Sequence, residues 1–532
     1  MVKRKAASKS ARKSSTRKTV KAAARRTAAR RSQIQAWPTD PLGGLPPLQT
    51  AVPTLPGSLL PTRIIAPANA PPVQVHDLGT DGFRFWTAAE ALRRSAAFWV
   101  AAGAKGWHPD VGKSIPIRLD DGIDLNAFYA RNDFPPEDIK QGLSFFHDTV
   151  HDAKNGQLVT VFSGESPDVV AHELGHAVLD SLKPVLFELG SIEAAAFHES
   201  FGDMSAILTA LQLPSVRQAV LQETKGILRR NSSVSRVAEQ LGFAIRQRNP
   251  AAVDGDSLRN AANSFVFVDP LTLPSSGPAT ALTRAPHNFS RVFTGAFLEA
   301  LGGMVTRVSA RPRVDDVEKA SLDMGRLLAK AAAEAPVSTN FFRAVAEQMI
   351  LADSELFDGK YAEALTTAFI RRNLMSVQSL AAPEAVGATP ARAAAAAARF
   401  SAAAAGRAPS REAAADTSVK VAIDGATLGL TVKTLYVEAP SVDDAGARRT
   451  SMMVGMAAPE TIGVARSADV QAFVESLIVR GRVSVSPAAG RRRGLAASLS
   501  QARRHVTHRL VSSAVEANAL ELKRIAFECC CC

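Results

Sequence analysis

Hydrophobic positions along the chain change their spacing several times, and each change predicts a different kind of element. Between Ile115 and Asp148 short, partly alternating apolar runs predict strands. Helical spacing begins at Thr87–Ala101 and returns after the strands, in residues 168–182, 191–211, 288–303, 315–335 and 339–373. This order predicts an α+β fold in which a strand-rich part precedes a helical part.

Changes in composition divide the 532 residues into more than one unit. Basic residues dominate the start, prolines follow, and an Ala/Pro/Arg-rich stretch interrupts the later part of the chain. Alternating apolar positions then predict a small β-rich module with a helix near 468–478. We therefore expect a disordered basic tail (1–36), a Pro-rich linker (37–80), a main domain (81–376), a second linker (377–416), the β-rich module (417–488) and a basic helical tail (489–532).

The net charge of +13 belongs to the first segment and not to the folded body. Residues 1–32 hold 13 Lys and Arg and no acidic residue, and without them basic and acidic residues are equal in number. Such a tail binds polyanions through phosphate neutralisation, without sequence specificity, unless it is simply solvated. No aromatic residue precedes Trp37, so stacking on nucleic-acid bases is not indicated.

Targeting signals and cysteines bear on the expected compartment. No apolar run approaches the roughly 20 residues of a membrane helix, and no apolar stretch follows the basic start as in a signal peptide. The four cysteines stand together at Cys529–Cys532, so no disulfide is expected in the body. We expect a cytoplasmic protein or one exported without a signal peptide; the cysteines could be lipidated, bind metal or be inert.

One segment, VVAHELGHAV from Val169 to Val178, has the spacing of a metal site. His172 and His176 are four residues apart, so on a helix both imidazoles can reach one ion. Glu173 lies beside them, where a carboxylate can take a proton from water. A solvated helix could carry the same letters, but the apolar flanks predict a buried helix, in which two histidines and a glutamate need partners.

A catalytic zinc site needs a third protein ligand and an open fourth position. Glu199, in HESFGD from His198 to Asp203, supplies that ligand on a second helix, and Asp203 one turn later is placed to orient a ligand histidine. Glu193 is the rival, but no acidic residue follows it four positions later.

With these motifs, residues from about Phe83 to Met375 resemble the thermolysin family of zinc peptidases, the gluzincins. The resemblance also covers NAFY at 126–129, GDSLR at 255–259, PHNFS at 286–290 and STNF at 338–341, in matching order. It implies a β-rich and an α-helical subdomain, one catalytic zinc and hydrolysis of peptide bonds. The roles it implies are substrate-backbone binding by Asn126 and Ala127, contact with a substrate carbonyl by Arg259, oxyanion stabilisation by His287, and an apolar pocket from Val169, Leu258 and Phe162.

The implied activity is a zinc endopeptidase that cleaves before large apolar residues, with Glu173 as the general base. Phe187 stands where the family has a tyrosine, and Leu282 lies near the position of an acid that would support His287. The region 212–248 lacks the acidic cluster of the family's calcium sites, so structural calcium is doubtful. Alternatives are a weak or inactive peptidase-fold binding protein tethered to polyanions by the tail, and a nucleic-acid architectural protein.

Overall fold

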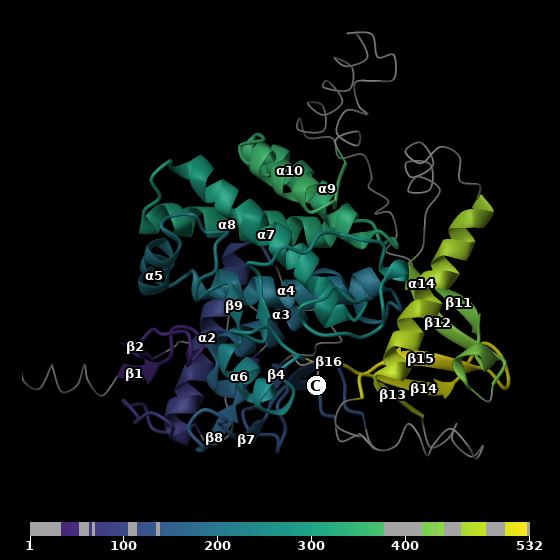
Figure 1. The fold of residues 1–532 in the computed structure, drawn as a ribbon, viewed down its shortest axis with the longest axis horizontal. Helices are drawn as coiled ribbons and strands as arrows, with labels where there is room; N and C mark the ends of the chain where they lie inside the picture. The colour runs from purple at the N-terminus through teal and green to yellow at the C-terminus, as the bar shows by residue number, and fades with distance from the viewer. Residues whose placement is uncertain are drawn as a thin grey trace, which may run out of the picture.

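The computed structural model describes residues 33–52, 63–65, 70–104, 114–134, 139–376, 418–430, 432–440, 459–485 and 506–528. It combines helices and sheets, with most strands at the two ends of the described chain and most helices between them (Figure 1). The predicted α+β class is therefore confirmed. Among the described residues, no helix is both long and apolar enough to cross a membrane.

A five-stranded sheet forms one side of the main domain, and its strand order is β16-β5-β6-β4-β3. Its strands are β3 (Arg63–Ile65), β4 (Ser114–Arg118), β5 (Ala127–Ala130), β6 (Gly142–Phe145) and β16 (Ala526–Glu528). β5 pairs antiparallel with β6 on one side and with β16 on the other. The outer strand thus comes from a segment about 400 residues further along the chain.

Helices fill the middle of the sequence, and α4 lies at their centre (Figure 1). All 19 residues of α4 are buried, because small and apolar residues occupy every face of it. It packs against α2, α3, α7 and α9. The helices are α2 (Asp81–Ala101), α3 (Pro167–Leu182), α4 (Ile192–Ala210), α5 (Pro214–Thr224), α6 (Glu239–Arg248), α7 (Pro286–Val308), α8 (Val314–Glu334), α9 (Phe341–Phe357) and α10 (Ala362–Arg371).

Two glycines let α3 and α4 approach closely. A Cβ at Gly175 would lie 3.1 Å from the Cα of Gly202 and 2.6 Å from the hydroxyl of Ser205. A Cβ at Gly202 would lie 2.5 Å from the ring of His172. Side chains at these two positions would force the helices apart, so the glycines set the distance between the two halves of the candidate site.

The helical series predicted over 339–373 is two helices, α9 and α10. Asp358 and Gly359 adopt left-handed backbone conformations, with φ of 53° and 73°, which end α9. The apolar spacing alone did not reveal this break. Two short antiparallel pairs complete the main domain, β7 (His147–His151) with β8 (Leu158–Phe162) and β9 (Arg236–Val237) with β10 (Arg259–Asn260).

The boundary predicted at the start of the fold is wrong. Residues assigned to the disordered tail and the Pro-rich linker form the hairpin β1 (Gln33–Ala36) and β2 (Leu48–Ala51). Trp37 donates its indole N–H to Glu165 at 3.2 Å, and Asp40 accepts from the hydroxyl of Ser166 at 2.7 Å. Prolines exclude helix but tolerate extended backbone, and these partners lie more than 120 residues away, beyond what local composition reveals.

The helical tail predicted for 489–532 is wrong over residues 508–528, which form three strands joined by turns and contain no helix. β14 (His508–Ser512) and β15 (Leu520–Arg524) complete a sheet of order β11-β12-β15-β14-β13, with α14 (Pro459–Val479) beside it. Its other strands are β11 (Ser418–Asp424), β12 (Thr434–Pro440) and β13 (Val483–Val485). The helix near 468–478 is confirmed. The buried Leu520 and Leu522 alternate with charged residues, a spacing of two that the abundance of basic residues obscured.

Three stretches that carried predictions lie wholly outside the described residues. They are the basic residues 1–32, the linker at 377–416 and Cys529–Cys532. Polyanion binding by the tail and modification of the cysteines therefore stay predictions.

Candidate metal centre

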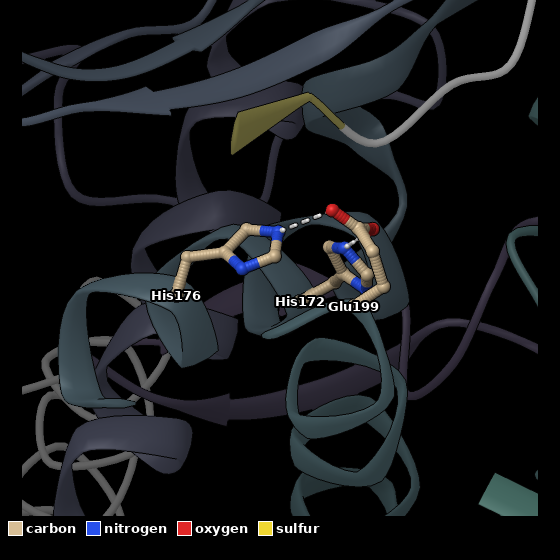
Figure 2. Close-up of side chains that lie close together, drawn as sticks. All are labelled: His172, His176 and Glu199. Atoms are coloured by element: carbon tan, nitrogen blue, oxygen red, sulfur yellow. Dashed lines mark ion pairs between the residues drawn. The ribbon is translucent and has the colours of Figure 1, made fainter. Parts of the chain in front are cut away.

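Two neighbouring helices bring His172, His176 and Glu199 together (Figure 2). Nε2 of His172 lies 3.5 Å from Oε2 of Glu199, and Nε2 of His176 lies 3.8 Å from Oε1 of the same carboxylate. One ligand atom from each of the three residues lies within 4.8 Å of the other two. Among the described residues this is the group of His, Cys, Asp and Glu side chains that could hold a metal ion.

The local sequence explains how α3 presents its two histidines. Pro167 occupies the first helical position and Asp168 the first turn, both favourable at a helix start. His172 and His176 follow at a spacing of four, so their rings lie one turn apart, with centroids 4.7 Å from each other.

The three side chains fit a metal ion because their inward atoms are buried without hydrogen-bond partners. Nε2 of both histidines and Oε2 of Glu199 lack a partner and are shielded from solvent. Leaving such polar atoms unsatisfied costs about 1–3 kcal/mol each, unless something binds to them. Two imidazoles and one carboxylate form a ligand set typical of catalytic zinc sites.

A second layer of charged residues orients the site. Oδ1 of Asp203 lies 3.0 Å from Nδ1 of His172, so the other ring nitrogen faces the centre. Nη2 of Arg259 donates to Asp203 at 2.7 Å, and its Nε donates at 2.9 Å. Arg259 therefore lies at the centre, where the resemblance put it, but here it binds the acid behind His172.

These contacts set the pKa values of the groups. Burial alone would lower the pKa of His172, but the carboxylates of Asp203 and Glu199 outweigh burial and raise it to about 9. His176 has no counterpart of Asp203 bonded to its ring, so burial and the nearby His172 hold its pKa well below the ordinary value. Burial would raise the pKa of Asp203, but the Arg259 charge and the bond to His172 outweigh it and hold the pKa low. Metal binding at His172 must therefore displace a proton.

Glu173 lies on the same turn of α3 as the ligands and is fully buried. Neither of its carboxylate oxygens has a hydrogen-bond partner. Burial raises its pKa to about 8, opposed by the charge of His172 and supported by that of Glu199. A carboxyl group with a pKa near neutrality can accept a proton and return it, as a general base requires.

Two further residues with predicted roles are His287, which lies beside the ligand Glu199, and Asn126, which lies immediately before β5. Nε2 of His287, near the start of α7, is 3.2 Å from Oε2 of Glu199. Its Nδ1 has no hydrogen-bond partner, in keeping with the expected lack of a supporting acid. Asn126 precedes β5, is buried, and accepts the backbone N–H of Ala127 at 2.9 Å.

Of the three residues predicted to form an apolar pocket, only Leu258 lines a cavity near the centre. A cavity of about 350 Å³ is lined by Leu258, Arg259 and His287, among others. Val169 is fully buried in the core and is not one of its lining residues. Phe162 is not a lining residue either, because its ring stacks on His147, with centroids 5.1 Å apart.

The structure also shows the surroundings of Glu193 and Phe187. The rival ligand Glu193 lies outside the metal group and accepts the backbone N–H of Phe342 at 2.9 Å. Phe187, the departure from the family's tyrosine, packs edge-to-face against Tyr129 and lies under the guanidinium of Arg131.

Sequence reasoning missed the residues that cover the centre. Phe527 of β16 stacks on His198, with ring centroids 3.9 Å apart, and on His176, with centroids 5.0 Å apart. Glu528 pairs with Arg482 at 2.7 Å. His198 could have been suspected, because a histidine inside an otherwise apolar helix needs a partner. No local signal pointed to Phe527 or Glu528, because their partners are remote in the sequence.

No protein-family model matches this chain, and no curated protein is detectably similar to it. The functional argument therefore rests on the geometry of the site and on the motifs that form it.

Proposed function

We propose that this protein is a zinc-dependent endopeptidase of the thermolysin type. The observation that carries the proposal is the buried group of His172, His176 and Glu199, whose inward atoms have no hydrogen-bond partners. Glu173 on the same helix turn supplies an unpaired carboxylate beside that group. A purely structural site would have no use for an additional unpaired carboxylate, because burying one is costly.

Each residue of the site has a part in this reaction. Zinc would supply Lewis acidity, which polarises a peptide carbonyl and makes water nucleophilic at neutral pH. Glu173 takes the proton of the attacking water and later delivers it to the leaving amine. His287 donates a hydrogen bond to the carbonyl oxygen as negative charge develops on it. Asp203, held by Arg259, keeps His172 in the orientation that the ligand set needs.

The β5 edge and the adjacent cavity support a peptide as the substrate. An extended peptide can add to a strand edge through main-chain hydrogen bonds, which makes binding tolerant of sequence. The cavity of about 350 Å³ next to Leu258 and His287 would receive one large side chain on the far side of the bond to be cut. We therefore propose cleavage before a large apolar residue.

The test compares zinc content and casein cleavage in the wild-type chain and in Glu173→Gln. We expect about one zinc per chain in both proteins, and cleavage reduced by about 10²–10⁴-fold in the variant, because only the proton acceptor is lost. Glu193→Gln is a matched control, since it makes the same substitution at another buried glutamate, here on α4, and its amide oxygen can still accept the N–H of Phe342.

The outcomes separate the possibilities. Full cleavage by Glu173→Gln would refute the assigned mechanism. Absence of zinc from the wild-type chain would refute the metal site. Loss of zinc in Glu193→Gln, but not in Glu199→Gln, would show that the rival carboxylate is the ligand.

A further inference from the structure

The edge of β5 that faces the metal centre is already occupied by part of the same chain. β16 pairs antiparallel with β5, in the register Ala526 to Ala130, Phe527 to Tyr129 and Glu528 to Phe128. In Figure 2 the yellow strand that crosses above the three ligands is β16. A peptide that adds to this edge needs the same backbone groups, so β16 and an external peptide exclude each other.

The side chain of Phe527 closes the site from above. Its ring stacks on both His176 and His198 and packs edge-to-face against Phe187, with centroids 5.5 Å apart. Phe527 is 2% exposed, and both ligand histidines are 0% exposed. No external peptide reaches these histidines while this ring is in place.

Glu528 is held by both its backbone and its side chain. Its carbonyl oxygen lies 2.5 Å from Nε2 of His287, which must therefore be the donor. Its carboxylate pairs with Arg482 at 2.7 Å and accepts from Nδ2 of Asn126 at 3.4 Å. The carbonyl thus takes the hydrogen bond that the proposed mechanism reserves for a substrate carbonyl.

Little space is left between β16 and Glu199, although the cavity of about 350 Å³ described above also borders His287. A cavity of about 30 Å³ remains, lined by Glu199, His287, Phe527 and Glu528 among others. A volume of this size holds a water molecule or a similarly small ligand, not a peptide.

We propose that β16 is an intramolecular ligand of the peptide-binding edge, which keeps the site latent until the strand leaves. The inactivity of the site rests on the proposed function, because it supposes a peptidase. The pairing of β16 with the edge of β5 does not depend on catalysis. The site then prefers peptides that carry an aromatic residue followed by an acidic one on the amino-terminal side of the cleaved bond, as in Phe527-Glu528. The stacking surface of His198 and the charge of Arg482 would select those two side chains.

A tethered strand competes strongly because it is always nearby. With an effective concentration on the order of millimolar and a micromolar affinity of the β16 segment itself for the edge, binding of an external peptide would be weakened by about 10³-fold. Only three residues of β16 pair with β5, so a small number of substitutions should release the strand.

The experiment weakens β16 in the full chain and measures binding and activity separately. The variant Phe527→Ala/Glu528→Ala removes both side-chain anchors. A control, Phe357→Ala/Glu516→Ala, removes the same two residue types away from β5 and β16: Phe357 packs edge-to-face against Tyr361, and Glu516 accepts from Tyr436. The probe is a fluorescent peptide amide, Arg-Ile-Ala-Phe-Glu, and its binding is followed by anisotropy with and without zinc. Casein cleavage is assayed in parallel.

We expect the released variant to bind the probe at least 10-fold more tightly than the wild-type and control chains. Amides of β5 should exchange faster with deuterium in that variant alone, and zinc-loaded cleavage should rise at least 10-fold. Glu528→Gln, which keeps the shape of the side chain, serves as a milder second variant if the double variant does not fold, with a smaller gain in probe binding expected.

Failure of this inference differs from failure of the proposed function. If the folded variants bind the probe no better than the wild-type chain and β5 exchange is unchanged, β16 is a structural strand and the inference is wrong, whatever the cleavage assay shows. If probe binding rises but no zinc-loaded form cleaves casein or peptides, the occupancy holds and the peptidase assignment fails.

Discussion

Two pairs of elements meet at the metal centre, and they are built in opposite ways. α3 and α4 are neighbours in sequence, cross at Gly175 and Gly202, and bury nearly every side chain between them and the surrounding helices. β16 and β5 are separated by about 400 residues and pair over only three positions. The first pair is a rigid support for the ligands, whereas the second is a small contact with much less to hold it.

The difference predicts which part of the site stays folded when the protein opens locally. Opening the helix pair would expose a large buried core, so its free energy approaches that of global unfolding. Releasing β16 breaks a short ladder, the ring contacts of Phe527, the hydrogen bond from His287 to Glu528 and the ion pair with Arg482. Local opening should therefore occur at the strand and not at the ligands. Asp203→Asn and Gly202→Ala test this contrast at the helix pair, and Asp40→Asn, of intermediate expected effect, tests a buried carboxyl elsewhere.

Asp203→Asn should give the largest effect. It removes the carboxylate that pairs with both His172 and Arg259, and breaking a buried ion pair by removing one member costs about 3–5 kcal/mol of unfolding free energy. Metal affinity should fall by about 10–100-fold, because the orientation of His172 is lost. Urea unfolding and competition with a metal chelator measure the two effects.

Asp180→Asn is the matched control for that experiment. Asp180 is also buried, lies on α3, and binds Arg131 and Tyr129, and it makes no hydrogen bond or ion pair with the three ligands. It should lose stability without a comparable loss of metal affinity, and Glu528→Gln should leave metal affinity unchanged. Equal metal losses in all three variants would contradict the distinction between the helix pair and the strand pair.

Asp40→Asn should change how stability depends on pH. Burial raises the pKa of Asp40 to about 6, above its ordinary value of 3.8, while its bonds from Leu42, Ser166 and Gln240 oppose the shift. The protonated form is thus favoured in the folded state, so this stabilisation is complete below about pH 4 and is lost as pH rises through about 6.

The variant keeps the neutral form at every pH. Relative to the wild-type chain it should gain up to about 3 kcal/mol of unfolding free energy between pH 4 and pH 7. Unfolding by urea at several pH values measures this difference. Parallel stability curves for the two proteins would show that Asp40 does not titrate in this window.

Gly202→Ala should have the smallest of these effects. The added methyl group would meet the ring of His172 at 2.5 Å, and such overpacking costs about 1–3 kcal/mol. Metal affinity should fall as His172 moves. Gly255→Ala is the control, since a Cβ there meets nothing within 4 Å and its φ is not positive. If Gly202→Ala binds metal as tightly as the wild-type chain, α3 and α4 can adjust their separation at little cost, and the packing argument is wrong.

The sequence predicted the helix pair well because its chemistry is local. A spacing of four residues places His172 with His176 and Glu199 with Asp203, whatever else the chain does. The lengths of the helices also follow from periodicity, apart from the break at Asp358 and Gly359. Which of the two candidate glutamates joins the histidines depends on how the helices cross, and the motif order indicated Glu199 correctly for the group that the structure shows.

The strand pair could not be predicted from the sequence. Nothing in the residues around Phe527 indicates a partner near Tyr129, since strand pairing depends on topology and not on local propensity. The abundance of basic residues after residue 488 favoured a helical interpretation and concealed the alternation at Leu520 and Leu522. The hairpin around Trp37 was missed for the same reason, because its partners lie in α2 and α6 and in the turn before α3.

The separation of β16 from β5 also has a consequence in time. Residues are added to a growing chain at about 5–20 per second, so β5 is made some tens of seconds before the strand that covers it. During that interval the ligands and the open edge can already be folded on the ribosome. A nascent chain would then pass through a stage in which its edge is free to pair with any extended segment nearby, including another nascent copy.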